Sequence, residues 1–110
     1  MEDTHMYRVI AIWSAPKAGD VDAFERDYLQ THCVKARKVP HLQALELTRT
    51  DKGLEGHAPG FYRVAVLAFA DEATFEKAAA TAEWRALRED AGELIARYGV
   101  TLTVGNGEGD

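Results

Sequence analysis

The sequence is short of cysteine, of positive charge and of long apolar runs. Its single cysteine, Cys33, excludes an intramolecular disulfide within the 110 residues. No apolar stretch approaches the ~20 residues of a membrane-spanning helix, and the N-terminus lacks the basic and apolar regions of a signal peptide. A net charge of -5 argues against binding to nucleic acids or anionic membranes, because both require basic patches. We therefore expect a cytoplasmic protein that binds neither.

The motifs of common metal, cofactor and nucleophile sites are absent as well. The 4 histidines show no i, i+4 pairing and the cysteine has no partner at zinc spacing, so we expect no metal site. The glycines of the segment 51–60 match neither a phosphate-binding loop nor a dinucleotide fingerprint, and no Gly-x-Ser-x-Gly motif occurs. We expect no cofactor and no covalent serine or cysteine chemistry.

Local patterns predict an α+β fold. Segments rich in β-branched, aromatic or alternating apolar residues are predicted strands: 7–14, 41–49, 61–70 and 100–104. Segments with helical spacing that begin at Asp20, Asp71 or Thr81 are predicted helices: 20–38, 71–80 and 81–98, the last ending at Gly99. This β-α-β-β-α-β order is typical of the ferredoxin-like fold, a four-stranded antiparallel sheet with helices on one face. We expect one domain, residues 1–110, with a core over about 6–104 and a flexible tail over 105–110.

The first and third predicted strands are apolar on both faces. Val9 and Trp13 alternate with Ile10 and Ile12, and the strand 61–70 is apolar at nearly every position. An antiparallel sheet that helices cover on one side normally places polar residues on the other. Each large apolar side chain left in water forgoes ~1.5–3 kcal/mol relative to burial. We therefore expect the sheet of a second copy to cover the bare face, which makes a homodimer.

One histidine lies on the apolar side of the first predicted helix. Successive residues turn ~100° around a helix, so Phe24, Tyr28, His32 and Ala36 share one stripe. Cys33 falls away from this stripe and is expected to be a passive thiol. A buried imidazole must be hydrogen-bonded, neutral or next to a cavity, because an unpaired buried charge is costly. His32 is therefore either a general acid or base, or a core histidine bonded to a backbone carbonyl.

Several other side chains are candidates for the same site. Asp90 lies at the edge of the apolar stripe of the last helix, where its carboxylate is either solvated or turned inward to pair with His32. Tyr28, Trp13 and Trp84 are either flat walls of a binding pocket or ordinary core residues. A further candidate stands alone in an apolar strand. Arg63 either binds a carboxylate or enolate or keeps its head group in water at a strand end.

Two motifs together resemble the EthD family, named for ethyl tert-butyl ether degradation. The first is Phe24-x3-Tyr28-x3-His32 followed by Pro40. The second is the segment from Phe69-x-Asp71 through Ala82-Glu83-Trp84 to Asp90. The resemblance covers roughly residues 7–104 and implies a dimeric α+β barrel. It also implies kinship with small cofactor-free enzymes that act on lactones or aromatic polyketides, and with accessory proteins of oxidative degradation.

The leading hypothesis is a cofactor-free EthD-like protein that binds an apolar or aromatic metabolite between helix and sheet. If it is an enzyme, His32 moves a proton at an acidic C–H or a lactone oxygen with help from Asp90, as in an isomerase, cyclase or dehydratase. The alternative is a non-catalytic accessory or binding subunit in which His32 is structural. The least favoured hypothesis is a cofactor-free monooxygenase, which only fold analogy supports.

Overall fold

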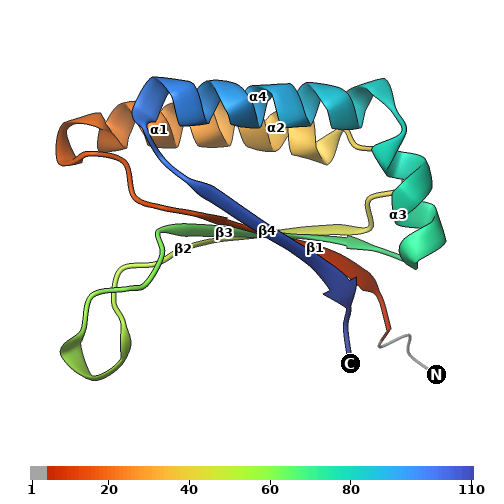
Figure 1. Ribbon diagram of the computed structural model, residues 1–110, viewed down its shortest axis with the longest axis horizontal. Coiled ribbons are helices and arrows are strands. Elements are labelled where there is room, and N and C mark those ends of the chain that lie inside the picture. Colours follow the sequence, from red (N-terminus) through yellow and green to blue (C-terminus); the bar gives the residue numbers. More distant parts are fainter. Residues whose placement is uncertain (1–4) are drawn as a thin grey trace.

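A layer of helices lies on one face of a four-stranded antiparallel sheet in the computed structural model, which describes residues 5–110 (Figure 1). The strands are β1 (Tyr7–Trp13), β2 (Ala44–Arg49), β3 (Arg63–Phe69) and β4 (Leu102–Glu108). The helices are α1 (Val21–Asp27), α2 (Cys33–Arg37), α3 (Glu72–Ala79) and α4 (Ala82–Tyr98). Three single turns complete the secondary structure: η1 (Ala18–Asp20), η2 (Tyr28–His32) and η3 (Leu54–Gly56). The predicted ferredoxin-like α+β fold is confirmed.

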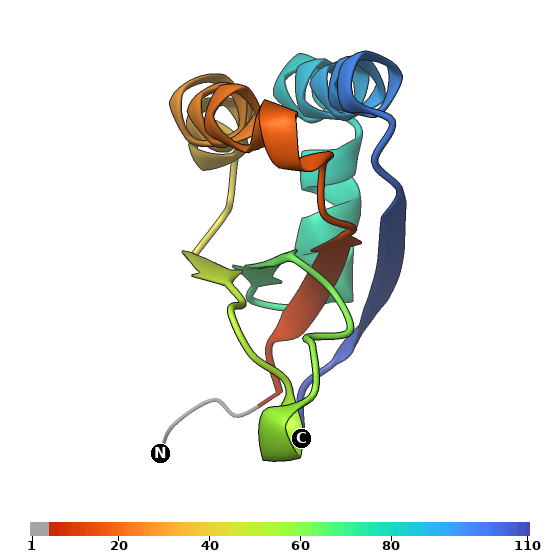
Figure 2. The same ribbon diagram turned by 90° about the vertical axis from the view of Figure 1, so that its left-hand side faces the viewer.

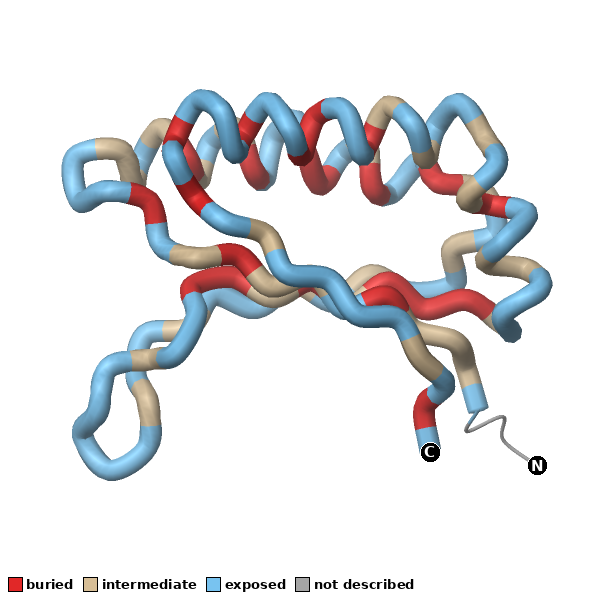
Figure 3. Tube along the Cα trace, viewed as in Figure 1, coloured by how far each residue is buried: buried red, intermediate tan, exposed pale blue. Residues whose placement is uncertain are grey.

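The strand order β2-β3-β1-β4 places the two most apolar strands in the middle of the sheet. Both central strands pair on each side, and every pairing is antiparallel. The row of α1, η2 and α2 lies beside α4 above the sheet, while α3 fills one end between the two layers (Figure 2). Buried positions of the helices face the sheet, as Figure 3 shows by colour. The core is therefore the space between the two layers.

Side-chain caps mark where α3 and α4 begin, as the sequence predicted. The Asp71 side chain accepts a hydrogen bond from the Thr74 amide at 2.8 Å, and Thr81 accepts one from the Trp84 amide at 3.2 Å. Gly99 ends α4 with a φ of 66°, a left-handed conformation that favours glycine. Asp20 occupies the N-cap position of α1, as predicted, but its side chain makes no capping hydrogen bond, and it also ends the turn η1.

The first helical segment contains one wide turn that the sequence pattern did not predict. In η2, a π-helical turn, the Cys33 amide donates to the Tyr28 carbonyl five residues earlier. The extra residue in this turn rotates Cys33 toward the same side as Tyr28 and His32, and all three are buried. The expectation that Cys33 lies away from the apolar stripe is therefore wrong.

The last strand is longer than expected. The sequence predicted an end at Val104 and a flexible tail over 105–110, but β4 pairs with β1 as far as the Tyr7–Glu108 position. The Gly109 amide also donates to the Met6 carbonyl at 2.8 Å. Glycine is a weak strand former, yet a neighbouring strand with free backbone groups offers these residues a ladder of hydrogen bonds.

This longer strand makes a testable prediction about amide exchange. Along an antiparallel ladder, hydrogen-bonded residue pairs alternate with pairs that are not hydrogen-bonded. The bonds at Ser14–Thr101 and Met6–Gly109 show which of the pairs between β1 and β4 are the hydrogen-bonded ones. The amides of Gly105 and Gly107 should therefore point at β1 and exchange slowly, whereas that of Asn106 should face the open edge and exchange fast. Residue-resolved hydrogen exchange by NMR measures this pattern. Equally fast exchange of all three amides would contradict this pairing and support the flexible tail predicted over 105–110.

Candidate functional site

A cavity of about 360 Å³ lies between the helical layer and the sheet. All four strands contribute apolar side chains to its wall, such as Val9, Leu47, Leu67 and Leu102. The volume and the apolar lining are typical of a small-molecule site. None of the described residues of the loop 51–60 lines it, and in Figure 1 this loop projects from the far side of the sheet.

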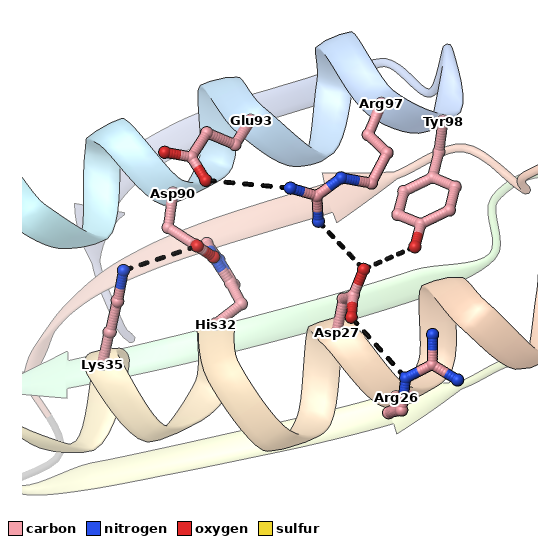
Figure 4. A network of polar contacts seen from close by, with 8 residues as sticks. All are labelled: Arg26, Asp27, His32, Lys35, Asp90, Glu93, Arg97 and Tyr98. Carbon is pink, nitrogen blue, oxygen red and sulfur yellow. Dashed lines mark hydrogen bonds and ion pairs between the residues drawn. The ribbon is translucent and has the colours of Figure 1, made fainter.

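The structure brings together the two residues that the sequence singled out for proton transfer. His32 comes from η2 and Asp90 from the facing side of α4, and Figure 4 shows them pointing toward each other. His32 Nδ1 lies 2.9 Å from Asp90 Oδ2, and both residues are buried, at 8% and 6% exposure. Lys35 Nζ lies 3.5 Å from the other carboxylate oxygen of Asp90. The alternative of a solvated Asp90 is therefore wrong.

One ring nitrogen of His32 carries no proton and can accept a hydrogen bond or a proton. Burial lowers the pKa of His32 below its usual value, although the Asp90 carboxylate opposes the effect by favouring the charged ring. The ring is therefore neutral near pH 7. We assign its proton to Nδ1 because a carboxylate accepts there, so Nε2 carries the lone pair. No described residue hydrogen-bonds Nε2, and His32 lines the cavity.

Aromatic side chains surround the imidazole. The Tyr28 ring stacks on it at 5.7 Å between centroids, and the Trp13 ring meets it edge-on at 5.4 Å. Trp13, Tyr28 and Trp84 all lie next to the cavity. Trp13 and Tyr28 are also core residues, at 1% and 0% exposure, so both alternatives given for them stand, and Trp84 is half-buried. Burial raises the pKa of Tyr28, so its hydroxyl stays protonated.

Arg63 differs from both of its predicted roles. It is buried at 7% exposure instead of reaching water, and it does not line the cavity. Its Nε lies 3.2 Å from Glu25 Oε2, and its Nη2 donates to the other oxygen of the same carboxylate. Tyr62 donates a further hydrogen bond to Glu25 at 2.7 Å. A guanidinium bound in this way supports the packing of α1 on the sheet. The pair of N–H groups with which it would bind a ligand carboxylate is already occupied by Glu25.

Among the cavity residues with a polar or thiol side chain, sequence reasoning missed Cys33, Arg88 and Asn106. Cys33 was hidden by the π-helical turn, and Asn106 by the expectation of a flexible tail. Burial raises the pKa of the Cys33 thiol to about 11, which fits the predicted passive thiol. Arg88 could have been found from its place one turn after Trp84 on the same helix.

A second polar contact joins the helices outside the cavity. Asp27 of α1 accepts hydrogen bonds from Tyr98 and, at 3.0 Å, from Arg97 of α4 (Figure 4). Neither Asp27 nor its partners line the cavity. This contact therefore links the same two helical rows as the His32–Asp90 pair without facing a ligand.

Residues 5–110 contain no cluster of metal-binding side chains and no membrane-spanning helix. No group of three or more His, Cys, Asp or Glu side chains in this part of the chain is arranged to hold a metal ion. Within the same residues, every helix is too short or too polar to cross a bilayer.

The fold defines a small α+β protein with an apolar cavity between its two layers. No protein-family model and no curated protein matches the chain. A solved structure from Bacillus halodurans C-125, an ethyl tert-butyl ether degradation (EthD) family protein, is 28% identical with a TM-score of 0.75. The match covers 91% of this chain and 96% of that one. This likeness confirms the resemblance to the EthD family that the sequence predicted.

More distant structures share the fold alone. HapK from Hahella chejuensis is 20% identical with a TM-score of 0.62, over 96% of this chain and 91% of that one. A dimeric ferredoxin-like protein of unknown function from Jannaschia sp. CCS1 is 13% identical with a TM-score of 0.60, over 91% and 97%. A DABB family protein from Mesorhizobium loti and an antibiotic biosynthesis monooxygenase also match, at 12% and 20% identity.

The lowered pKa of His32 predicts how stability depends on pH. Between the ordinary value of 6.5 and the lower value in the folded protein, the unfolded chain binds this proton more readily. The free energy of unfolding should therefore fall as pH drops below 6.5, by at most about 1.4 kcal/mol per pH unit for one proton. Denaturant titrations between about pH 7.5 and about pH 5.5 measure this slope.

The substitution His32→Gln should flatten the slope, and the same change at His57 in the exposed loop serves as the control. Glu25 and Asp27, whose pKa values are lowered from 4.5 and 3.8, titrate below this window. A slope that is the same in His32→Gln and in the unmodified protein would contradict the lowered pKa.

Proposed function

We propose that the cavity binds an apolar or aromatic metabolite and that His32 transfers a proton to and from it. The observation that carries this proposal is the buried His32–Asp90 pair on the wall of an apolar cavity, with Nε2 unbonded among the described residues. A proton transfer of this kind is the chemistry of a cofactor-free isomerase, cyclase or dehydratase. It fits the resemblance to the EthD family.

The roles of the two residues follow from their charges. The neutral ring accepts a proton on Nε2 from an acidic C–H of the ligand, and returns it to another atom of the ligand. Asp90 orients the ring through Nδ1 and stabilises the imidazolium while it exists. Lys35 shares the Asp90 carboxylate and so limits how strongly that carboxylate raises the basicity of the ring. Tyr28, Trp13 and Trp84 provide flat surfaces against which an aromatic ring can pack.

Proton transfer is tested with 2-tetralone, an aromatic ketone with acidic C–H bonds next to its carbonyl. The protein should accelerate deuterium uptake from D₂O above the protein-free rate, measured by proton NMR. His32→Gln should reduce the acceleration about 100-fold or more, and Asp90→Asn about tenfold or more. Asp27→Asn makes the same change between the same helices outside the cavity and should keep the full rate.

The outcomes separate an enzyme from a binding subunit. Binding of 2-tetralone without accelerated exchange, or exchange that survives His32→Gln, would remove the catalytic role of His32. The chain would then fit the alternative of an accessory or binding subunit, in which His32 and Asp90 hold the helices together.

We also propose that the chain forms a homodimer through the outer face of the sheet. Ile10 lies opposite Val66 and Ile12 opposite Val64 in the β1–β3 ladder, so their side chains share the face turned away from the cavity. No helix covers this face (Figure 2), and Ile10 is 39% exposed. The dimeric ferredoxin-like protein from Jannaschia sp. CCS1 supports pairing in a protein of this fold.

Matched isoleucines test the dimer. Ile10→Lys should give a monomer at micromolar concentration, because it places a charge in the apolar interface. Ile95 on α4 is 38% exposed and faces away from the sheet layer, so Ile95→Lys should stay dimeric. Sedimentation equilibrium measures the mass of each variant. A monomeric unmodified protein, or a dimeric Ile10→Lys variant, would contradict the proposed interface.

A further inference from the structure

The cavity reaches solvent between α4 and the edge strand β4. Arg88 of α4 lines it, and so do Val104 and Asn106 of β4, and all three residues are exposed. In Figure 1, β4 leaves the end of α4 after Gly99 and slants away from the helix. Side chains that line a cavity and also reach solvent mark its opening. Arg88 and Asn106 therefore stand on the two sides of an entrance to the cavity.

Arg88 lies on the flank of α4 that is opposite the polar pair. Asp90 points from α4 toward His32 of the neighbouring helical row, at 2.9 Å. Arg88 comes two residues earlier and so points ~200° around the helix from Asp90. In Figure 2, α4 lies above the β4 side of the sheet, so this flank faces the open edge, away from the other helical row. A ligand in the cavity would thus meet His32 at one end and Arg88 at the other.

The Arg88 guanidinium has no partner within residues 5–110. No hydrogen bond or ion pair joins it to another described side chain, whereas Arg63 and Arg97 each bind a carboxylate. The residues one turn away on α4 are Trp84, Arg85, Ala91 and Gly92, and none of them carries a carboxylate. Arg88 therefore keeps its donors free at the entrance.

The charge of Arg88 is not balanced on the cavity wall. No acidic residue of the described part of the chain lines the cavity, although the sequence has 18 acidic against 13 basic residues. The charge also acts on the proposed base. Burial is the main cause of the lowered pKa of His32, and the positive charges of Lys35 and Arg88 lower it further. The guanidinium is therefore close enough to the interior to attract an anionic group there.

We infer that Arg88 binds a carboxylate of the ligand at the opening between α4 and β4, so that the cavity takes apolar monocarboxylates. This inference rests on the proposed binding function and adds the charged group of the ligand and the residue that selects it. The planar guanidinium presents paired N–H donors that match the two oxygens of a carboxylate. The side-chain amide of Asn106 has a further N–H donor on the other side of the opening. The apolar body of the ligand then lies inside, toward His32.

The experiment compares 2-naphthoate, which is ionised at pH 7, with 2-naphthamide, which has the same ring system without the charge. The readout is the ratio of the 2-naphthamide and 2-naphthoate dissociation constants, measured by ligand-observed NMR, because changes in cavity shape affect both probes alike. The unmodified protein should bind 2-naphthoate more tightly. Arg88→Gln should lower the ratio about fivefold, a modest factor because water screens an exposed guanidinium.

Arg85→Gln is the matched control. Arg85 is exposed on the same helix and does not line the cavity, so removing its charge should leave the ratio unchanged. Both variants should unfold at the same denaturant concentration as the unmodified protein, since neither side chain has a partner to lose. Added salt gives a second readout. It should weaken the binding of 2-naphthoate and leave that of 2-naphthamide unchanged.

The outcomes distinguish this inference from the function on which it rests. If 2-naphthamide binds as tightly as 2-naphthoate, or if Arg88→Gln keeps the ratio, the inference fails while the binding function stands. If Arg85→Gln lowers the ratio as much as Arg88→Gln, the overall charge of α4 is responsible, and the inference fails in the same way. If 2-tetralone binds but neither naphthalene probe does, only the inference fails. If none of the three compounds binds, both proposals fail.

Discussion

A single buried hydrogen bond, between His32 Nδ1 and Asp90 Oδ2, joins the two helical rows above the cavity and fixes the orientation of the imidazole. Taking a carboxylate out of water is costly, and here the cost is offset by a ring N–H on one oxygen and the Lys35 ammonium near the other. Because the ring donates from Nδ1, its lone pair is left on Nε2. The same bond thus holds the helices together and leaves a base on the cavity wall.

The local geometry around this bond comes from the π-helical turn at Tyr28–His32. This turn places an aromatic ring, the imidazole and the Cys33 thiol together on the cavity wall. π-Helical turns are rare in proteins, but those that occur are often found at functional sites. The turn at Tyr28–His32 therefore accords with the proposed role of His32. Below the turn, strands that are apolar on both faces have one face on the cavity. Their other face is left for the proposed partner copy.

Sequence patterns predicted the elements, the family resemblance and the two residues of the polar pair. Each depended on local spacing: the caps at Asp71 and Thr81, and the stripe that contains His32. What the patterns missed depends on contacts between distant segments. Asp90 is 58 residues from His32, so the sequence offered their pairing only as one of two alternatives, and it missed the contact between Arg63 and Glu25, which are 38 residues apart. The glycines of β4 become a strand only because β1 offers them backbone partners.

The most direct test of the account is the ¹⁵N NMR spectrum of the His32 ring. We expect a neutral ring at pH 7, with a protonated Nδ1 and an unprotonated Nε2 whose chemical shift moves when 2-tetralone is added. In Asp90→Asn, the preference for this tautomer should weaken. A charged ring at pH 7, or a neutral ring with its proton on Nε2, would contradict the claim that His32 presents a base to the cavity.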